Sequence, residues 1–434
     1  MTQPLLYQNS PAIGTGSPNS DLIADDMRSI VEQALETVPR GSRVLAVIPD
    51  KTRDDNTHTL FPFAVEILER KGAASFDALV AQGTHSPMAE AEKLAKIGFT
   101  KPPPILGNIY DHRWNVPAEL VTVGELPADQ VEKITNGIFT EAIPLAINRL
   151  VAPGNYDLIL VFGATMPHEV AGFAGGAKYF FPGIAGKELT HKTHWLAALA
   201  TIEKIIGRVE TPSRHLIEAA ADQISTPIIN FTSVITRTDD ARLQTHALFC
   251  GDLRSSLRKA AEISRHVHIK YTGRKYSRVV ALLDEHYEDL WLGGKASYRL
   301  GAVIEEGGEL IIYAPRLRCI SDTHGEDIER FGGYAPIEKI KDLVASSGEL
   351  QANLCVAAHL AHVSYAGRTD PNGEFVPRYR IKLASQVDPE TCRRVNLEYL
   401  DHRTFNVADH QNDPNTLVVE RAGRDLYLVE PATD

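Results

Sequence analysis

Residues 43–85 read RVLAVIPDKTRDDNTHTLFPFAVEILERKGAASFDALVAQGTH. The apolar runs Arg43–Pro49 and Phe76–Ala81 are typical of buried strands, and Thr59–Arg70 between them has the apolar spacing of a helix closed by Gly72. The order strand, helix, strand is that of a parallel αβ unit. The segment therefore predicts an α/β fold with mainly parallel sheets.

The rest of the chain indicates two domains of this kind. Its 434 residues are too many for one ordinary core. The polar segment Lys270–Tyr276 indicates the boundary, which gives an N-terminal domain over residues 1–270 and a C-terminal α/β domain over residues 271–434. Further helices are expected at Leu22–Val38, Asn136–Leu150, Ser213–Ile224, Leu253–His268, Trp291–Leu300 and Pro336–Ser346, strands at Tyr156–Phe162, Val279–Leu283 and Glu309–Tyr313, a hairpin over Thr416–Val429, and a connection over residues 101–125.

Composition narrows the class of protein. The formal net charge is −11 and is spread along the chain, which argues against binding of a phosphate backbone as the main task. The first twenty residues have neither a basic start nor a long apolar core, so we expect a loose arm rather than a signal peptide, and no apolar run is long enough for a membrane span. The four cysteines form no CxxC pair, which favours reduced thiols in a cytoplasmic protein.

Polar side chains follow the two strands of the opening segment. Asp50 comes directly after the first strand, and His85 follows the second within the sequence Gly83-Thr84-His85. In parallel sheets ligands gather beyond the carboxyl ends of the strands, so we expect both side chains to lie in a cleft. Arg53, three residues after Asp50, offers a planar fork for a carboxylate, although the two could equally form a surface ion pair.

The segment MPHEVAGFAGGAKYFFPGIAGKELTHKTHW, residues 166–195, is the richest in chemistry. Glycines let backbone N–H groups approach an anion, so a phosphate-bearing ligand near Gly175, Gly176 and Lys178 is reasonable. The spacing matches neither a P-loop nor a GxGxxG fingerprint, and a plain tight turn is an equal alternative. His191 and His194 would share one face of a helix, as metal ligands or as a solvated surface.

A later segment, DLWLGGKASYR at residues 289–299, holds Trp291 and Lys295. The lysine could hold a substrate anion while the indole forms a wall of the pocket, and an ordinary amphipathic helix with an exposed lysine is the alternative. His359 and His362 lie in an Ala-rich stretch and are expected to be packing residues.

Taken in order, these segments resemble the nickel-pincer-nucleotide-dependent lactate racemase family. The family's D-x-T-R resembles Asp50 to Arg53, and its G-T-H resembles Gly83 to His85. Its histidine, Gly-rich stretch with lysine, P-G and further histidine resemble His168, Lys178, Pro182-Gly183 and His194, and its late lysine resembles Lys295. The resemblance is good over roughly residues 40–300 and is general after that.

The resemblance implies a nickel pincer nucleotide, made by separate enzymes, in a site within the interdomain cleft. Lys178 matches the lysine of the covalent link, and His194 matches the nickel ligand. Gly175, Gly176 and Thr52 would contact the nucleotide. His85 and His168 match the paired acid/base histidines. Arg53, Lys295, Asp50 and Trp291 would bind or support the substrate, and a homo-oligomer is possible in such a protein.

The implied reaction is inversion of C2 in a 2-hydroxy acid. Removing hydride leaves a neutral ketone, whereas removing the α-proton would build a second negative charge beside the carboxylate, and hydride transfer needs a cofactor. Inversion needs a base on each face, hence two histidines. Leu292 stands where a polar residue is expected, so the predicted substrate is not lactate itself but malate, an aryl-lactate or an aldonate such as gluconate.

Two other functions are compatible with these residues. A zinc-dependent hydrolase could use His168, His191 and His194 as ligands. A catalytically inactive homologue that binds sugar acids or nucleotides could keep the glycine turn. Such a homologue has no need for both His85 and His168, so their joint presence with Lys178 counts against it.

Overall fold

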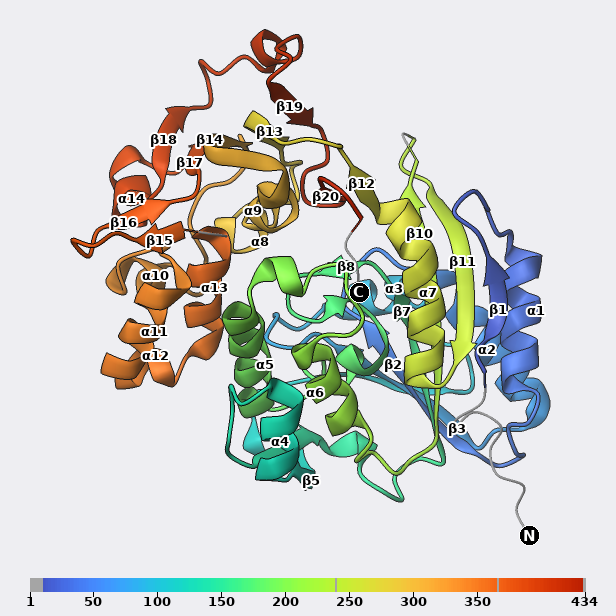
Figure 1. Cartoon of the computed structure of the whole chain (residues 1–434). Helices are drawn as coiled ribbons and strands as arrows, with labels where there is room; N and C mark the ends of the chain where they lie inside the picture. The colour runs from blue at the N-terminus through green and yellow to red at the C-terminus, as the bar shows by residue number, and fades with distance from the viewer. Residues whose placement is uncertain (1–10, 239, 365–366, 432–434) are drawn as a thin grey trace. The chain divides into compact units, whose positions relative to one another are not determined.

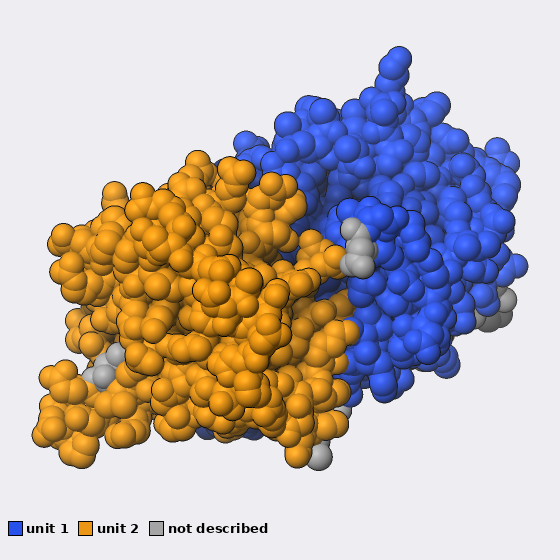
Figure 2. Space-filling model, turned by 90° about the horizontal axis from the view of Figure 1, so that it is seen from above, with its two compact units in different colours: residues 1–193, 207–267 blue, residues 194–206, 268–434 orange. Residues whose placement is uncertain are grey.

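The opening segment forms β2 (Arg43–Pro49), α2 (Thr57–Lys71) and β3 (Ser75–Ala81), and the two strands are parallel. The computed structural model of the chain describes residues 11–238, 240–364 and 367–431. It divides into two compact units, Met1–Thr193 with Gly207–Val267 and His194–Ile206 with His268–Asp434, called unit 1 and unit 2 (Figure 2). No helix in the described ranges is long and apolar enough to cross a membrane.

Unit 1 is built on a seven-stranded sheet (Figure 1). Its strands lie in the order β1 (Ile13–Gly16), β11 (Leu243–Gly251), β10 (Ile228–Arg237), β7 (Leu158–Ala164), β2, β3 and β4 (Leu106–Asp111). The strands from β10 to β4 run parallel, while β1 and β11 pair antiparallel at one edge. All seven residues of β7 are buried, as expected for a central parallel strand covered on both faces.

Helices cover both faces of this sheet. On one face, alternate residues of β2 (Val44, Ala46 and Ile48) join a core with α1 (Ala24–Leu35) and α2. On the other face α7 (Leu253–His268) packs against β10 and β11 (Figure 1). The C-cap of α2 is Gly72, whose left-handed φ of 71° ends the helix as the sequence predicts.

Unit 1 has four further α-helices among its described residues. They are α3 (Glu90–Lys96), α4 (Ala128–Thr135), α5 (Lys187–Ala200), which continues into unit 2, and α6 (Pro212–Ala221). Two small antiparallel pairs complete the unit: β5 (Leu120–Leu126) with β6 (Ile143–Asn148), and β8 (Pro167–His168) with β9 (Gly172–Phe173).

Unit 2 holds a five-stranded parallel sheet. The strand order is β18 (Glu398–Asp401), β17 (Arg380–Ser385), β14 (Ile304–Tyr313), β13 (Tyr276–Leu282) and β19 (Thr416–Val419). Its helices include α8 (Leu290–Gly293), α9 (Lys295–Leu300), α10 (Gly325–Arg330), α11 (Ile337–Ser346), α12 (Gly348–Gln351), α13 (Leu354–Ser364) and α14 (Pro389–Arg394), and its short strands are β12 (Ile269–Tyr271), β15 (Gly367–Thr369), β16 (Phe375–Pro377) and β20 (Leu426–Leu428). The predicted α/β class with mainly parallel sheets is confirmed.

Four local predictions were wrong. The segment Asn136–Leu150 contains β6 rather than a helix, because its alternating apolar residues pair with β5. Residues 101–125 include β4 and the start of β5 rather than only a connection. The described part of the N-terminal arm contains β1, which pairs with β11. The predicted hairpin over Thr416–Val429 does not form, since β19 pairs with β13 and β20 pairs with β12, both in parallel.

Candidate functional site

Three neighbouring strands of the unit 1 sheet deliver the predicted residues to one edge. The carboxyl end of β2 is followed by Asp50, that of β3 by the turn leading to His85, and that of β7 by the Gly-rich segment 165–178. Strand β2 lies between β3 and β7, and all three are parallel, so these segments emerge side by side. The backbone N–H of Gly83 donates to the carbonyl of Gly183 at 2.9 Å, which ties the turn before His85 to the loop that follows Lys178.

Asp50, which is buried, and His85, which is half-buried, form an acid–imidazole pair. The Nδ1 atom of His85 lies 2.7 Å from Oδ2 of Asp50, while Thr52 donates to Oδ1 from its backbone N–H (2.8 Å) and its hydroxyl (2.5 Å). Burial alone would raise the pKa of Asp50, but the hydrogen bonds from His85 and Thr52 and the charge of Arg53 hold that pKa well below its ordinary value. The carboxylate is therefore ionised and accepts a hydrogen bond from Nδ1 of His85, so in the neutral ring the lone pair lies on Nε2.

The guanidinium of Arg53 lies near this pair. Its backbone N–H donates to the carbonyl of Asp50 at 3.3 Å. Its half-buried guanidinium makes no hydrogen bond or ion pair with any residue that the structure describes. Its charge lowers the pKa values of both Asp50 and Lys178, so the three groups are neighbours. A partly buried, unpaired guanidinium is suited to a ligand carboxylate.

Lys178 lies in η3 (Gly176–Tyr179), the short 3-10 helix that follows the glycine turn. Burial, followed by the charge of Arg53, lowers the pKa of its half-buried amine to about 7, against the weaker opposing charges of Glu169 and Asp50. The amine makes no hydrogen bond or ion pair within the described ranges. At neutral pH much of it is therefore uncharged, which is the nucleophilic form of a lysine.

His168 is held in the opposite manner to His85. It ends β8, and its Nδ1 accepts hydrogen bonds from the backbone N–H groups of Val170 (3.1 Å) and Ala171 (3.4 Å). Because a backbone N–H only donates, Nδ1 of His168 is unprotonated and the proton of the neutral ring lies on Nε2. That Nε2 lies 3.9 Å from Oε1 of Glu169.

The glycine turn before Lys178 packs tightly on α7. A Cβ atom at Gly175 would lie 2.9 Å from the hydroxyl oxygen of Thr165 and 3.3 Å from Leu257, and one at Gly176 would lie 2.9 Å from the carbonyl oxygen of Leu253. Both residues also have positive φ, 99° and 59°. Packing thus accounts for these glycines, and their contact with a nucleotide phosphate remains a prediction.

Two residues that the sequence did not single out support the same loop. Tyr179 lies against the end of β7, where a Cβ atom at Gly163 would lie 2.0 Å from its hydroxyl oxygen, so only glycine fits beneath it. Arg214, at the start of α6, is fully buried and donates to carbonyls of the Gly-rich segment. An arginine in an Ala-rich helical stretch gives no local signal of such a contact.

The helix predicted for His191 and His194 is present as α5, in which His191 is buried and His194 is half-buried. Among the residues that the structure describes, no group of three or more His, Cys, Asp and Glu side chains is placed to hold a metal ion. A zinc site built from His168, His191 and His194 therefore has no support in that part of the chain. A nickel sphere completed by His194 alone is not tested by this observation.

Trp291 and Lys295 belong to unit 2, on α8 and at the start of α9, and both are half-buried. The indole ring packs against two imidazoles, with centroid distances of 4.4 Å to His324 and 4.2 Å to His359. His359 is in turn held by the hydroxyl of Tyr298, 3.0 Å from its Nδ1, so its predicted packing role is confirmed. Burial lowers the pKa of His324, so this imidazole beside Trp291 is neutral.

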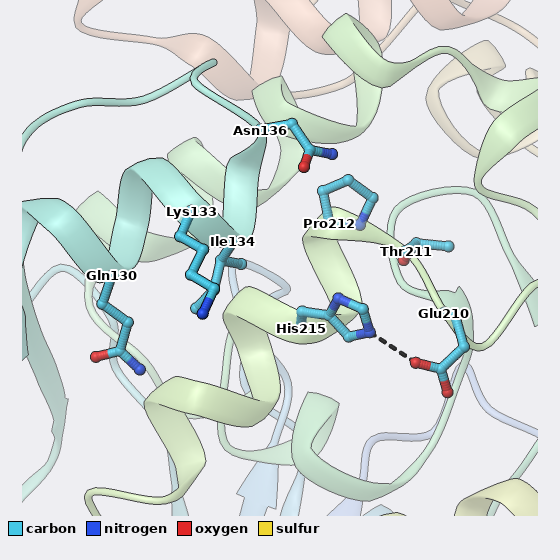
Figure 3. Close-up of a pocket in the computed structure, with 8 residues that line it drawn as sticks. All are labelled: Gln130, Lys133, Ile134, Asn136, Glu210, Thr211, Pro212 and His215. Atoms are coloured by element: carbon cyan, nitrogen blue, oxygen red, sulfur yellow. Dashed lines mark hydrogen bonds and ion pairs between the residues drawn. The ribbon is translucent and has the colours of Figure 1, made fainter.

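A separate pocket of about 500 Å³ lies between α4 and α6 in unit 1 (Figure 3). It is lined by Gln130, Lys133, Ile134, Asn136, Glu210, Thr211, Pro212 and His215. The imidazole of His215 points at Glu210, with Nε2 2.7 Å from Oε2. None of the predicted site residues lines this pocket, so it is not part of the candidate site.

The chain is similar in sequence to known lactate racemases. Residues 19–205 match the lactate racemase N-terminal domain family. A lactate racemase of Lactiplantibacillus plantarum is 30% identical over 167 residues, which cover 37% of this chain and 34% of the relative. The match thus spans about a third of the length of that curated relative.

Two solved structures share the fold. A Thermotoga maritima protein is 31% identical, with a TM-score of 0.85, over 94% of this chain and 98% of its own. The lactate racemase apoprotein of Thermoanaerobacterium thermosaccharolyticum is 17% identical, with a TM-score of 0.65, over 98% of this chain and 96% of its own. Residues 19–205 therefore belong to the lactate racemase N-terminal domain family, and the whole chain shares the fold of a lactate racemase apoprotein.

Proposed function

We propose that the chain is an isomerase, a racemase or epimerase that inverts C2 of a 2-hydroxy acid through hydride removal and return. One observation carries the proposal: the Asp50–His85 pair lies beside an unpartnered guanidinium, Arg53, and a half-neutral amine, Lys178. A base, a carboxylate-binding group and an attachment point for a cofactor are what this reaction requires of a protein.

The residues present fit the nickel pincer nucleotide of the family. The side chain of Lys178 is half-buried, and its amine has a pKa of about 7 and makes no hydrogen bond or ion pair within the described ranges. Such an amine suits a covalent link. When bound, this cofactor supplies the hydride acceptor that side chains lack. We assign the link to Lys178, the nickel ligand to His194, and further contacts to Gly175, Gly176 and Thr52.

The chain's own residues then divide the work on the substrate. Arg53 binds the carboxylate through its planar fork and holds it while C2 changes configuration. The Nε2 atom of His85 accepts the hydroxyl proton as hydride leaves, and the charge of Asp50 stabilises the imidazolium that results. His168, with a proton on Nε2, serves the opposite face, where the new hydroxyl forms.

The substrate is proposed to differ from lactate. We assign Lys295 as a second group for the substrate carboxylate and Trp291 as a wall against the rest of the molecule. The neighbouring Leu292 is half-buried and apolar, which removes a hydrogen-bonding group from that wall. The proposed substrates are malate, an aryl-lactate or an aldonate such as gluconate. We propose that the protein acts in the cytoplasm, where the cofactor-making enzymes are its partners for maturation.

The test begins with the cofactor. The chain is co-expressed with the cofactor-making enzymes, and its intact mass is compared with those of Lys178→Ala and Lys187→Ala. Lys187 is an exposed lysine of the same segment and serves as the control. We expect an adduct on the native chain and on the control, and none on Lys178→Ala. An unchanged adduct on Lys178→Ala would remove the linkage from this residue.

The loaded protein is then assayed for inversion with lactate, malate, phenyllactate and gluconate by chiral chromatography. Inversion of at least one acid other than lactate is expected, and Lys178→Ala should abolish it. Loaded protein that inverts no 2-hydroxy acid of any of these kinds would contradict the proposed reaction.

A further inference from the structure

A fully buried cation lies under the loop that joins His168 to Lys178. The guanidinium of Arg214 donates to the carbonyl oxygen of Ala171 from Nε (3.1 Å), to that of Gly175 from Nη1 (3.3 Å) and to that of Phe173 from Nη2. Arg214 has no solvent exposure. Its hydrogen-bonding capacity is thus directed at the backbone of residues 171–175.

The start of α6 holds this loop at a second point. The hydroxyl of Ser213 donates to the carbonyl oxygen of Val170 at 2.5 Å. The N–H groups of Val170 and Ala171 donate in turn to Nδ1 of His168. Consecutive peptide groups are therefore bound by α6 on their carbonyl side and by the catalytic imidazole on their amide side.

Stability alone is a poor reason for a cation at this position. No carboxylate of the described residues lies within ion-pair distance of Arg214, and Glu218, the acidic group whose charge raises the pKa of Arg214 most, pairs with Arg254 and Arg258. Burial lowers the pKa of Arg214 to about 10, which shows that the fold opposes its charge. Apolar residues of similar volume are often as stabilising as buried charges, so a retained cation indicates a specific task.

The far end of the loop carries Lys178. After burial and Arg53, the charge of Arg214 also lowers the pKa of this amine. The carbonyl of Gly175, bound by Arg214, also accepts the backbone N–H of Lys178 at 3.3 Å. Geometry and charge both connect the buried guanidinium with the reactive amine.

We propose that Arg214 is a positioning residue of the site, whose guanidinium fixes the backbone of residues 171–175 and thereby sets the places of His168 and Lys178. The importance of these places rests on the proposed function. The positioning itself is a property of the chain and can be measured on protein that carries no cofactor.

The test measures acetylation of Lys178 by acetic anhydride against pH, by peptide mass spectrometry on full-length protein. Arg214→Gln removes the charge and the fork, so we expect the midpoint pH of Lys178 acetylation to rise. A rise of one unit from a midpoint near 7 lowers the neutral fraction at pH 7 about fivefold. Hydrogen exchange at the amides of Val170 and Ala171 should rise as well, because the next peptide group along the loop, whose Ala171 carbonyl Arg214 binds, loses its anchor.

Two companion variants separate charge from geometry. Arg214→Lys keeps the charge but not the three-carbonyl fork, so the acetylation midpoint should stay close to that of the native chain while exchange at residues 170–171 rises. Ser213→Ala removes one hydrogen bond at the other end of the loop, and exchange there should rise about fivefold. If Arg214→Gln does not fold, Arg214→Lys and Ser213→Ala still test the positioning role.

Arg299→Gln is the matched control. Arg299 is also buried, lies in unit 2, and donates to the carbonyl oxygen of Arg424 at 2.6 Å. This variant should change neither the acetylation midpoint nor the exchange of residues 170–171. Equal shifts in Arg299→Gln, or no shift in any folded variant of Arg214 and Ser213, would overturn the positioning role.

Because these measurements use no substrate, they separate the two proposals. If the Arg214 variants change acetylation and hydrogen exchange but the loaded protein has no isomerase activity, the positioning role stands and the proposed function is removed. If the loaded protein is an active isomerase but the Arg214 variants change neither measurement, the proposed function stands and the positioning role is removed.

Discussion

His85 and His168 follow strands β3 and β7, on either side of the Asp50 strand, but their Nδ1 atoms have opposite partners. A carboxylate accepts from His85 at 2.7 Å, whereas two backbone N–H groups donate to His168 at 3.1 and 3.4 Å. In the neutral ring, Nε2 is therefore unprotonated in His85 and protonated in His168.

Two histidines proposed for the two faces of one carbon therefore need not have the same protonated nitrogen. A proton arriving at His85 gives an imidazolium that Asp50 stabilises. Full protonation of His168 would place a proton on Nδ1 and cost its bonds from Val170 and Ala171. Under the proposed reaction, the site would deprotonate the enantiomer whose hydroxyl faces His85 and donate a hydrogen bond on the other side.

The largest expected effect comes from removing each imidazole in turn. His85→Gln should reduce oxidation of the enantiomer whose hydroxyl faces His85 by about 10²–10⁴-fold, while His168→Gln should reduce oxidation of the other enantiomer by less. The measurement is the amount of 2-oxo acid in an acid-quenched single turnover of loaded enzyme, started from each pure enantiomer. Nickel content, which neither substitution should alter, is the control. Equal losses in the two variants would mean that the two imidazoles are equivalent.

A smaller effect is expected when only the orienting charge is removed. Asp50→Asn should lower turnover on the order of 10²-fold or more, because the imidazolium of His85 loses its counter-charge. The folded state holds the pKa of Asp50 below its ordinary value of 3.8, so the ionised carboxylate stabilises the fold above about pH 4.

That stabilisation has a defined pH window. The difference in free energy of unfolding between the native chain and Asp50→Asn should be constant from pH 7 to pH 5 and change to the disadvantage of the native chain below about pH 4. Urea denaturation at several pH values measures it. If the difference in free energy of unfolding were the same at acid and at neutral pH, the folded state would not hold the pKa of Asp50 below its ordinary value.

The smallest effect is expected when Asp50 loses the hydrogen bond from the hydroxyl of Thr52. Thr52→Val removes the hydroxyl bond to Oδ1 of Asp50 but leaves the bond from its backbone N–H, so turnover should fall about fivefold. Thr84→Val, a change at an exposed threonine next to His85, should leave the rate nearly unchanged. Equal losses in the two variants would point to a general disturbance of these loops.

Much of this site could be predicted from local sequence. The apolar runs of β2 and β3 are continuous because both faces of these strands are covered, and such runs are visible without a structure. Parallel pairing then requires Asp50 and His85 to emerge at the same edge, and the 2.7 Å contact between them is the outcome.

Other parts gave no usable local signal. Strand β6 was predicted as a helix because its partner β5 lies more than a dozen residues away and no short-range pattern reveals the pairing. The C-terminal strands β19 and β20 were predicted to pair with each other, yet each finds a distant parallel partner. Arg214 was overlooked for the same reason, since the carbonyls that it binds lie some forty residues upstream.

The amino-acid sequence by itself determined the αβ pattern, the order of the chemical groups and the residue types at the strand ends, because each depends on neighbours within a few positions. Only the tertiary structure decided the state of those groups. The proton of His85, the proton of His168 and the lowered pKa of Lys178 depend on partners brought from separate strands and from α6. A hydrogen bond or a neighbouring charge acts through space, and only the fold sets which groups are close.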